Sequence, residues 1–192
     1  MSIEINPKCL RGSWDAGFAL DKHTRSSVYL GVDQWGHDRY ETTRSPVGEL
    51  LYELKYRSLQ SGVEPLAEAA ATFLAKLWTV DAIVPVPPSN ARTNQPVMAV
   101  ADAIAARLGV PVCKGCLTKT KQTPQLKDIT DYDKRKEVLS GAFSADPKLT
   151  TGKRLLLFDD LFGSGATVAH IAEVLKKDGQ AQAVYLLTLT TK

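Results

Sequence analysis

The pattern of apolar and polar positions changes near residue 45. Before this point, short apolar runs at 18–20 and 28–32 lie between turn-forming segments such as 33–36, a pattern typical of strands joined by tight turns. We therefore expect a small β-rich hood over residues 1–45. After it, segments with helical spacing alternate with continuous apolar runs, and we expect a second unit over residues 46–192.

Three helices are expected in the first part of the second unit, because the segments 47–54, 66–77 and 97–108 each carry apolar residues on one helical face. Ser45 and Pro46 suit the cap and first turn of the first helix, and Gly109 suits the end of the third. Between the second and third helices, an apolar run at 82–84 predicts a buried strand, which ends where prolines follow because proline cannot donate to a β-ladder. A brief strand is expected at 110–112.

The C-terminal part of the chain predicts a strand, a helix and a second strand. The continuous apolar run at 155–158 is typical of a strand buried on both faces, as in a parallel sheet. A helical stripe over 168–175 ends at Gly179, and another strand is expected at 183–189. This βαβ unit, together with the alternation before it, predicts an α/β fold with a parallel central sheet flanked by helices.

Composition excludes several classes of protein. The chain has 192 residues, of which 44% are hydrophobic, an ordinary share for a globular protein. Its net charge of +3 is too small to indicate a nucleic-acid-binding protein by itself. No apolar stretch is long enough to span a membrane, and the N-terminal residues lack the pattern of a signal peptide. We expect a cytoplasmic protein without membrane association.

The cysteines do not predict a metal centre. Three cysteines in a chain of this length do not form a disulfide framework. Cys113 and Cys116 have the spacing of half a zinc site, but a structural zinc ion needs four ligands. We expect two ordinary thiols and no zinc.

A glycine-rich turn between the strand at 155–158 and the following helix is the strongest candidate for a binding site. Ligands of open α/β sheets bind at the carboxyl ends of the strands. The amide groups of residues 164–167 and the positive end of the helix favour an anion such as a phosphate. The turn is neither a P-loop nor a dinucleotide-binding turn, since it lacks both motifs.

Asp159 and Asp160, directly before this turn, need a different explanation. Carboxylates repel a phosphate but suit hydroxyl groups or a metal ion. A sugar phosphate supplies hydroxyls for the acids and a phosphate for the turn. The residues alone therefore predict a site of the ribose 5-phosphate type, with a helix cap at Asp160 as the structural alternative and a different nucleotide-phosphate binder as the functional one.

The segment 155–167, LLLFDDLFGSGAT, resembles the PRPP-binding motif of type I phosphoribosyltransferases. Further matches are similar to the ComF family and to phosphoribosyltransferase domains attached to RecQ-type helicases. These matches are LKY at 54–56, IVPVPP at 83–88, TPQ at 123–125 and GAF at 141–143. The resemblance covers about residues 46–192 and implies a type I phosphoribosyltransferase-like fold with an N-terminal hood.

The resemblance also implies roles for individual residues. Asp159 and Asp160 would hold the ribose hydroxyls and, indirectly, Mg²⁺. The 5-phosphate would lie on the turn formed by Gly163, Ser164, Gly165, Ala166 and Thr167. The pyrophosphate loop would comprise Val86, Pro87, Pro88, Ser89 and Arg92. The basic segment 114–136 takes the place of the mobile loop of type I enzymes, and its candidate catalytic residues are Lys119, Lys121 and Gln125.

The implied reaction is transfer of the 5-phosphoribosyl group from PRPP to a nitrogen nucleophile with release of pyrophosphate. The alternative is a non-catalytic module that binds PRPP or a nucleotide and acts in DNA uptake or repair with partner proteins. The alternative gains support because the arginine-rich stretch that ComF proteins carry after the 83–88 strand is reduced here to Arg92 and the pair at 94–95. The acceptor is not identified by the sequence, and a homodimer is left open.

Overall fold

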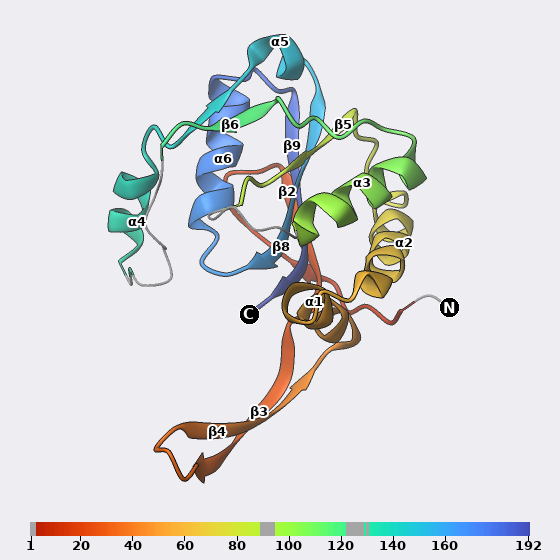
Figure 1. Cartoon of the computed structure of the whole chain (residues 1–192). Coiled ribbons are helices and arrows are strands. Elements are labelled where there is room, and N and C mark those ends of the chain that lie inside the picture. Colours follow the sequence, from red (N-terminus) through yellow and green to blue (C-terminus); the bar gives the residue numbers. More distant parts are fainter. Residues whose placement is uncertain (1–2, 89–94, 122–128, 130) are drawn as a thin grey trace.

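A computed structural model describes residues 3–88, 95–121, 129 and 131–192. Its centre is a sheet of five strands in the order β1-β2-β9-β8-β5 (Figure 1). In that order the strands are Lys8–Cys9, Ala16–Lys22, Ala183–Thr191, Arg154–Phe162 and Ala82–Pro85. The strands β2, β9, β8 and β5 run parallel to one another, and β1 is antiparallel to β2. The expected α/β fold with a mostly parallel central sheet is confirmed.

Helices cover both faces of this sheet (Figure 1). One face carries α1 (Pro46–Tyr56), α2 (Val63–Leu74) and α3 (Pro96–Leu108), and the short 3₁₀ helix η1 (Gln60–Gly62) joins the first two. The other face carries α6 (Ala166–Lys177). Near it lie α4 (Tyr132–Leu139), α5 (Pro147–Thr150), β6 (Leu117–Lys119) and β7 (Phe143–Ala145).

The apolar run in β8 belongs to two cores. Leu156 and Phe158 are buried in the core under α1–α3, whereas Leu155 and Leu157 are buried in the core under α6. Successive side chains of a strand point to opposite faces, so a strand covered on both sides needs apolar residues at every position. This explains why the run at 155–158 is continuous rather than alternating.

The N-terminal 45 residues contribute strands to two different sheets. β1 and β2 belong to the central sheet, where Phe18 of β2 lies in register with Leu187 of β9. Only the hairpin of β3 (Thr24–Val32) and β4 (Asp38–Arg44) projects away from the body (Figure 1). The apolar run at 18–20 is therefore a strand of the main sheet, paired with residues about 170 positions later in the chain.

The described residues of the basic segment 114–136 include regular structure. The helix α4 begins within it, at Tyr132. The segment also contains β6, which pairs antiparallel with β7 and was not predicted because it is only three residues long. Among the described residues, no helix combines the length and the apolar character needed to cross a membrane.

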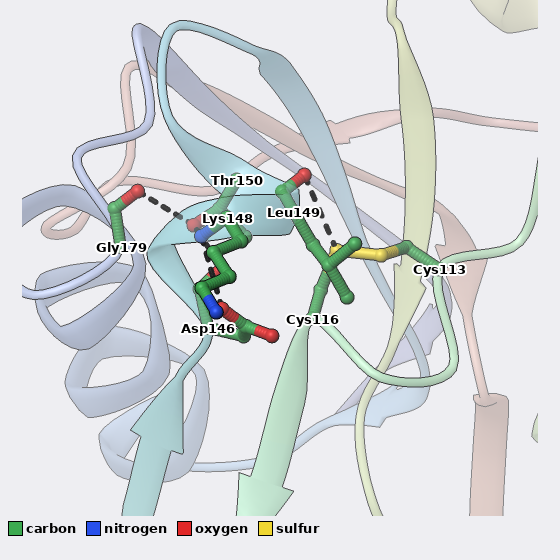
Figure 2. The surroundings of a disulfide bond; sticks show 7 residues. All are labelled: Cys113, Cys116, Asp146, Lys148, Leu149, Thr150 and Gly179. Atoms are coloured by element: carbon green, nitrogen blue, oxygen red, sulfur yellow. Dashed lines mark hydrogen bonds between the residues drawn. A yellow bond between two sulfur atoms is a disulfide. The ribbon is translucent and has the colours of Figure 1, made fainter.

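The expectation that Cys113 and Cys116 are ordinary thiols is wrong, because the two form a disulfide (Figure 2). Their Cα atoms lie 5.4 Å apart, and the intervening turn brings the chain from its bridge with β5 into β6. Cys116 is fully buried beside the carbonyl oxygen of Leu149 in α5. In the described part of the chain, no group of three or more potential metal ligands occurs, and the absence of zinc stays a prediction.

Candidate functional site

The two aspartates lie within β8, near its carboxyl end, and point to opposite faces of the sheet. Asp160 is on the face of Phe158 and therefore on the side of α1. Asp159 is on the face of Leu157, toward α6, in register with Thr188 of β9. The strand thus continues two residues beyond the acidic pair, to Phe162.

Asp160 is paired with a lysine from the last turn of α1. The Nζ atom of Lys55 lies 2.7 Å from Oδ2 of Asp160, and each of the two side chains is only 18% exposed. A partly buried carboxylate is stabilised by a cation at this distance. The packing of α1 on the sheet therefore supplies a positive charge at the end of β8.

Asp159 differs, because no ion pair joins it to a cation within the described part of the chain. Burial and the neighbouring charge of Asp160 raise the pKa of Asp159 to about 8, against the lowering effects of the Asp160 amide and of Lys55. The backbone N–H of Asp160 donates to Oδ1 of Asp159 at 2.8 Å. The Lys55–Asp160 pair therefore lies beside a carboxyl group, that of Asp159, whose raised pKa favours its protonated form at neutral pH.

The turn after β8 places the N-terminus of α6 at a cavity of about 230 Å³. Gly165 has a φ of 77°, a left-handed conformation that favours glycine. A Cβ atom at this position would lie 2.6 Å from the ring of Phe162. Gly165 has no side chain to cap the helix, and the Ser164 hydroxyl accepts a long hydrogen bond of 3.5 Å from the Ala166 N–H. The positive end of α6 faces the cavity.

A second cavity, of about 300 Å³, adjoins the first and extends toward α1 and β5. Both cavities are lined by Asp159 and Thr167. The second is also lined by Lys55, Asp160, Val86, Pro87, Pro88 and the start of α3. Together the cavities form a cleft across the carboxyl ends of β5 and β8, which is where open α/β sheets bind ligands.

The structure brings most of the predicted binding residues to this cleft. The acidic pair and all five residues of the turn line it, as do Val86, Pro87 and Pro88. Ser89, Arg92 and Gln125 lie outside the described residues.

The two lysines predicted to be catalytic lie elsewhere. Lys119 lines a neighbouring cavity of about 310 Å³ that shares Pro87 and Pro88 with the cleft. Lys121 lies near His170 of α6. Burial lowers the pKa of His170, and the positive charge of Lys121 lowers it further. Neither lysine lines the cleft that holds the acidic pair.

Two residues beside the cleft were not singled out by the sequence. Lys192 lines the cavity at the turn, and its N–H donates to the carbonyl oxygen of Phe162. His23 lies near Lys55, and burial together with the charges of Lys55 and Arg44 lowers its pKa. Both positions depend on pairing with β9, which no local pattern indicates.

No family model matches this chain, and no curated protein matches it. Among solved structures, it resembles the glutamine PRPP amidotransferase of B. subtilis complexed with ADP and GMP, at 20% identity and a TM-score of 0.52 over 82% of this chain. It also resembles the adenine phosphoribosyltransferases of Saccharomyces cerevisiae, at 12% identity and a TM-score of 0.51, and of Leishmania donovani, at 10% and 0.51. These two matches cover 86% and 97% of this chain, and 84% and 75% of the other proteins.

At such identities the likeness shows the fold alone, which is that of the type I phosphoribosyltransferases. The match covers only 35% of the length of the amidotransferase. The finer resemblance to the ComF family stays a prediction.

Proposed function

We propose that this chain binds PRPP and transfers its 5-phosphoribosyl group to a nitrogen nucleophile with release of pyrophosphate. The observation that carries the proposal is the cleft itself, in which an acidic pair and the N-terminus of α6 line adjoining cavities. Carboxylates accept hydrogen bonds from a ribose diol, and the helix terminus attracts a phosphate. The fold supports this assignment, since it is that of phosphoribosyltransferases.

In this proposal each part of the ligand has its own partner. The 5-phosphate lies on the turn of residues 163–167, and the ribose hydroxyls donate to Asp159 and Asp160. The diphosphate lies in the cavity bounded by Lys55 and Pro87. Binding of the diol favours the ionised form of Asp159, so we expect proton release when the ligand binds near neutral pH.

The described part of the pyrophosphate loop offers few hydrogen-bond donors. Pro87 and Pro88 have no N–H, and the N–H of Val86 already donates to the carbonyl oxygen of Phe158 at 2.8 Å. Among the described residues of the second cavity, Lys55 is therefore the cation most directly available to a diphosphate.

Magnesium fits this site as an ion carried by the substrate. Mg²⁺ is commonly held by one or two carboxylates together with substrate phosphates, and Asp159 and Asp160 supply such oxygens, whereas no cluster of three ligands occurs in the described residues. Bound with PRPP, the ion would neutralise charge on the leaving diphosphate.

The chain's contribution to the reaction is positioning. The nucleophile forms a bond to carbon 1 of the ribose while the bond from carbon 1 to the diphosphate oxygen breaks, and pyrophosphate leaves with the electron pair. The acidic pair and the turn hold the ribose 5-phosphate still as carbon 1 moves. Lys55 stabilises the negative charge that develops on the diphosphate.

The second candidate is a module that binds PRPP or a nucleotide without catalysis, in DNA uptake or repair. It is favoured by the positions of Lys119 and Lys121 outside the cleft and by the scarcity of donors at Pro87 and Pro88. The acidic pair and the turn suit both functions.

Two measurements test the proposal. Calorimetry with Mg-PRPP should show binding that Asp160→Asn weakens about ten- to hundredfold, through loss of charge-assisted hydrogen bonds, while binding of inorganic phosphate changes little. Asp102→Asn, at an exposed ion pair with Lys114, is the matched control. Pyrophosphate release with a panel of nitrogen bases then separates the two functions. Binding without turnover supports the second candidate. A lack of PRPP binding refutes the proposed transferase, and a lack of binding to both PRPP and ribonucleotides refutes both functions.

A further inference from the structure

The β3–β4 hairpin exposes apolar side chains on both of its faces. Six large apolar residues of this hairpin are more than half exposed, among them Trp35 at 73% and Tyr40 at 56%. The others are Val28, Tyr29, Leu30 and Val32. Figure 1 shows the hairpin as a ribbon that extends away from the body of the protein.

A two-stranded ribbon with exposed apolar side chains is expected to be only weakly stable in water. A two-stranded hairpin is marginally stable by itself, because a third strand or a helix is normally needed to cover its apolar face. An unpaired strand edge also presents free N–H and C=O groups that can pair with another chain. In the described part of the chain, β3 and β4 pair only with each other.

The free edge of β4 is regular, whereas that of β3 is not. Both irregularities of the ladder fall on β3, at Arg25 and Leu30, while Asp38–Arg44 is paired residue by residue. The N–H of Asp33 donates to the carbonyl oxygen of His37, so the backbone groups of His37 point inward. Because the direction alternates along a strand, those of Asp38, Tyr40 and Thr42 point outward.

We propose that the β4 edge binds a second copy of this chain, by antiparallel pairing of β4 with β4 about a two-fold axis at Tyr40. This register places outward-pointing residues opposite each other, Tyr40 on Tyr40 and Asp38 on Thr42. It places Arg39 of each copy opposite Glu41 of the other, so two pairs of opposite charge flank the axis. The result is a four-stranded sheet without an unpaired edge at β4.

Side chains and charge both fit a second copy. The rings of Tyr29 and Tyr40 are in contact across the hairpin, with centroids 5.4 Å apart. The two-fold axis would join two such pairs into one row of four tyrosines, and aromatic cross-strand pairs stabilise sheets. Residues 24–44 carry three arginines and three carboxylates, so two hairpins do not repel each other by net charge.

Sedimentation velocity of the full chain over a concentration series tests the dimer. A four-stranded interface is small, so we expect association with a dissociation constant of roughly micromolar order. Arg39→Glu and Glu41→Arg each place like charges opposite each other at both positions, and each should weaken the dimer at least about tenfold. The double variant restores opposite charges and should restore the dimer.

The matched control is Arg25→Glu, a charge reversal of the same type on β3, which should leave the dimer unchanged. A chain that stays monomeric at high concentration overturns the proposal. So does a dimer that is indifferent to the single reversals at Arg39 and Glu41, or a double variant that fails to regain association. Tryptophan fluorescence and circular dichroism of each variant show whether it is folded.

Discussion

Replacement of Lys55 by methionine tests the electrostatics of the cleft directly. At 2.7 Å from Asp160, the lysine contributes a gross attraction of about 6 kcal/mol at an effective dielectric constant of about 20, before desolvation is subtracted. Breaking a fully buried pair costs about 3–5 kcal/mol. Because both side chains are 18% exposed, we expect Lys55→Met to lower the free energy of unfolding by about 2–3 kcal/mol at pH 6.

The loss should also depend on pH, with a definite sign. Lys55 lowers the pKa of Asp159, which burial and Asp160 raise to about 8. Without Lys55 that pKa rises further, while the pKa in the unfolded chain is unchanged. When folding raises the pKa of a carboxyl group, the free energy of unfolding of the protein falls as the pH rises toward that folded-state pKa. The two proteins therefore lose stability in parallel up to pH 8, and the variant continues to lose it above pH 8.

Urea unfolding at pH 6 and pH 9, followed by tryptophan fluorescence, measures both effects. Lys55→Arg keeps the charge and should recover most of the loss. Lys119→Met, at a lysine outside the cleft, should change the free energy of unfolding by less than about 0.5 kcal/mol at either pH. An equal loss for Lys55→Met at the two pH values, or a loss no larger than that of the control, would refute this account of the pair.

Three further predictions concern the acid, the turn and the disulfide. Since the pKa of Asp159 is raised on folding, the stability gain of Asp159→Asn over the native protein should grow from pH 5 to pH 8 in urea unfolding, and a constant difference contradicts the raised pKa. Gly165→Ala places a side chain at a φ of 77° and against the Phe162 ring, and it should lower the free energy of unfolding by about 1–3 kcal/mol. Gly163→Ala, where a Cβ atom would meet open space, is the control. Equal losses for the two variants contradict the role of the backbone at Gly165. Replacing Cys113 and Cys116 by serine opens a loop of only four residues and should cost about 2 kcal/mol by the chain-entropy relation; a loss above about 4 kcal/mol in calorimetry would assign the disulfide a larger role.

The sequence predicted the parts of the fold that local patterns specify. The run at 155–158, the glycines of the turn and the stripe at 168–175 follow one another along the chain, so strand, turn and helix were recognisable together. The caps at Ser45 and Gly109 marked helix ends for the same reason: the Ser45 side chain accepts from the Gly48 N–H, and Gly109 is left-handed.

Features that depend on distant parts of the chain were not predictable in this way. β2 joins the sheet only through β9, and a short apolar run at 18–20 contains no information on that partner. Lys55 belongs to the LKY match at 54–56, but its helix alone suits a lysine in solvent equally well. It faces Asp160 because α1 packs across the sheet. The pairing of Cys113 with Cys116 likewise depends on the turn between β5 and β6 rather than on spacing alone.

The charges along the cleft connect the proposed ligand with its need for a cation. In the proposed binding mode, the 5-phosphate lies at the turn, on the N-terminus of α6. At the second cavity, Lys55 is the one cation among the described lining residues and is already paired with Asp160, and the prolines offer no N–H groups. A diphosphate that arrives there without Mg²⁺ must compete with Asp160 for Lys55 and also faces two carboxyl groups. We therefore expect PRPP to bind this cleft more weakly when EDTA is present, whereas ribose 5-phosphate, which has no diphosphate, binds equally well with and without it.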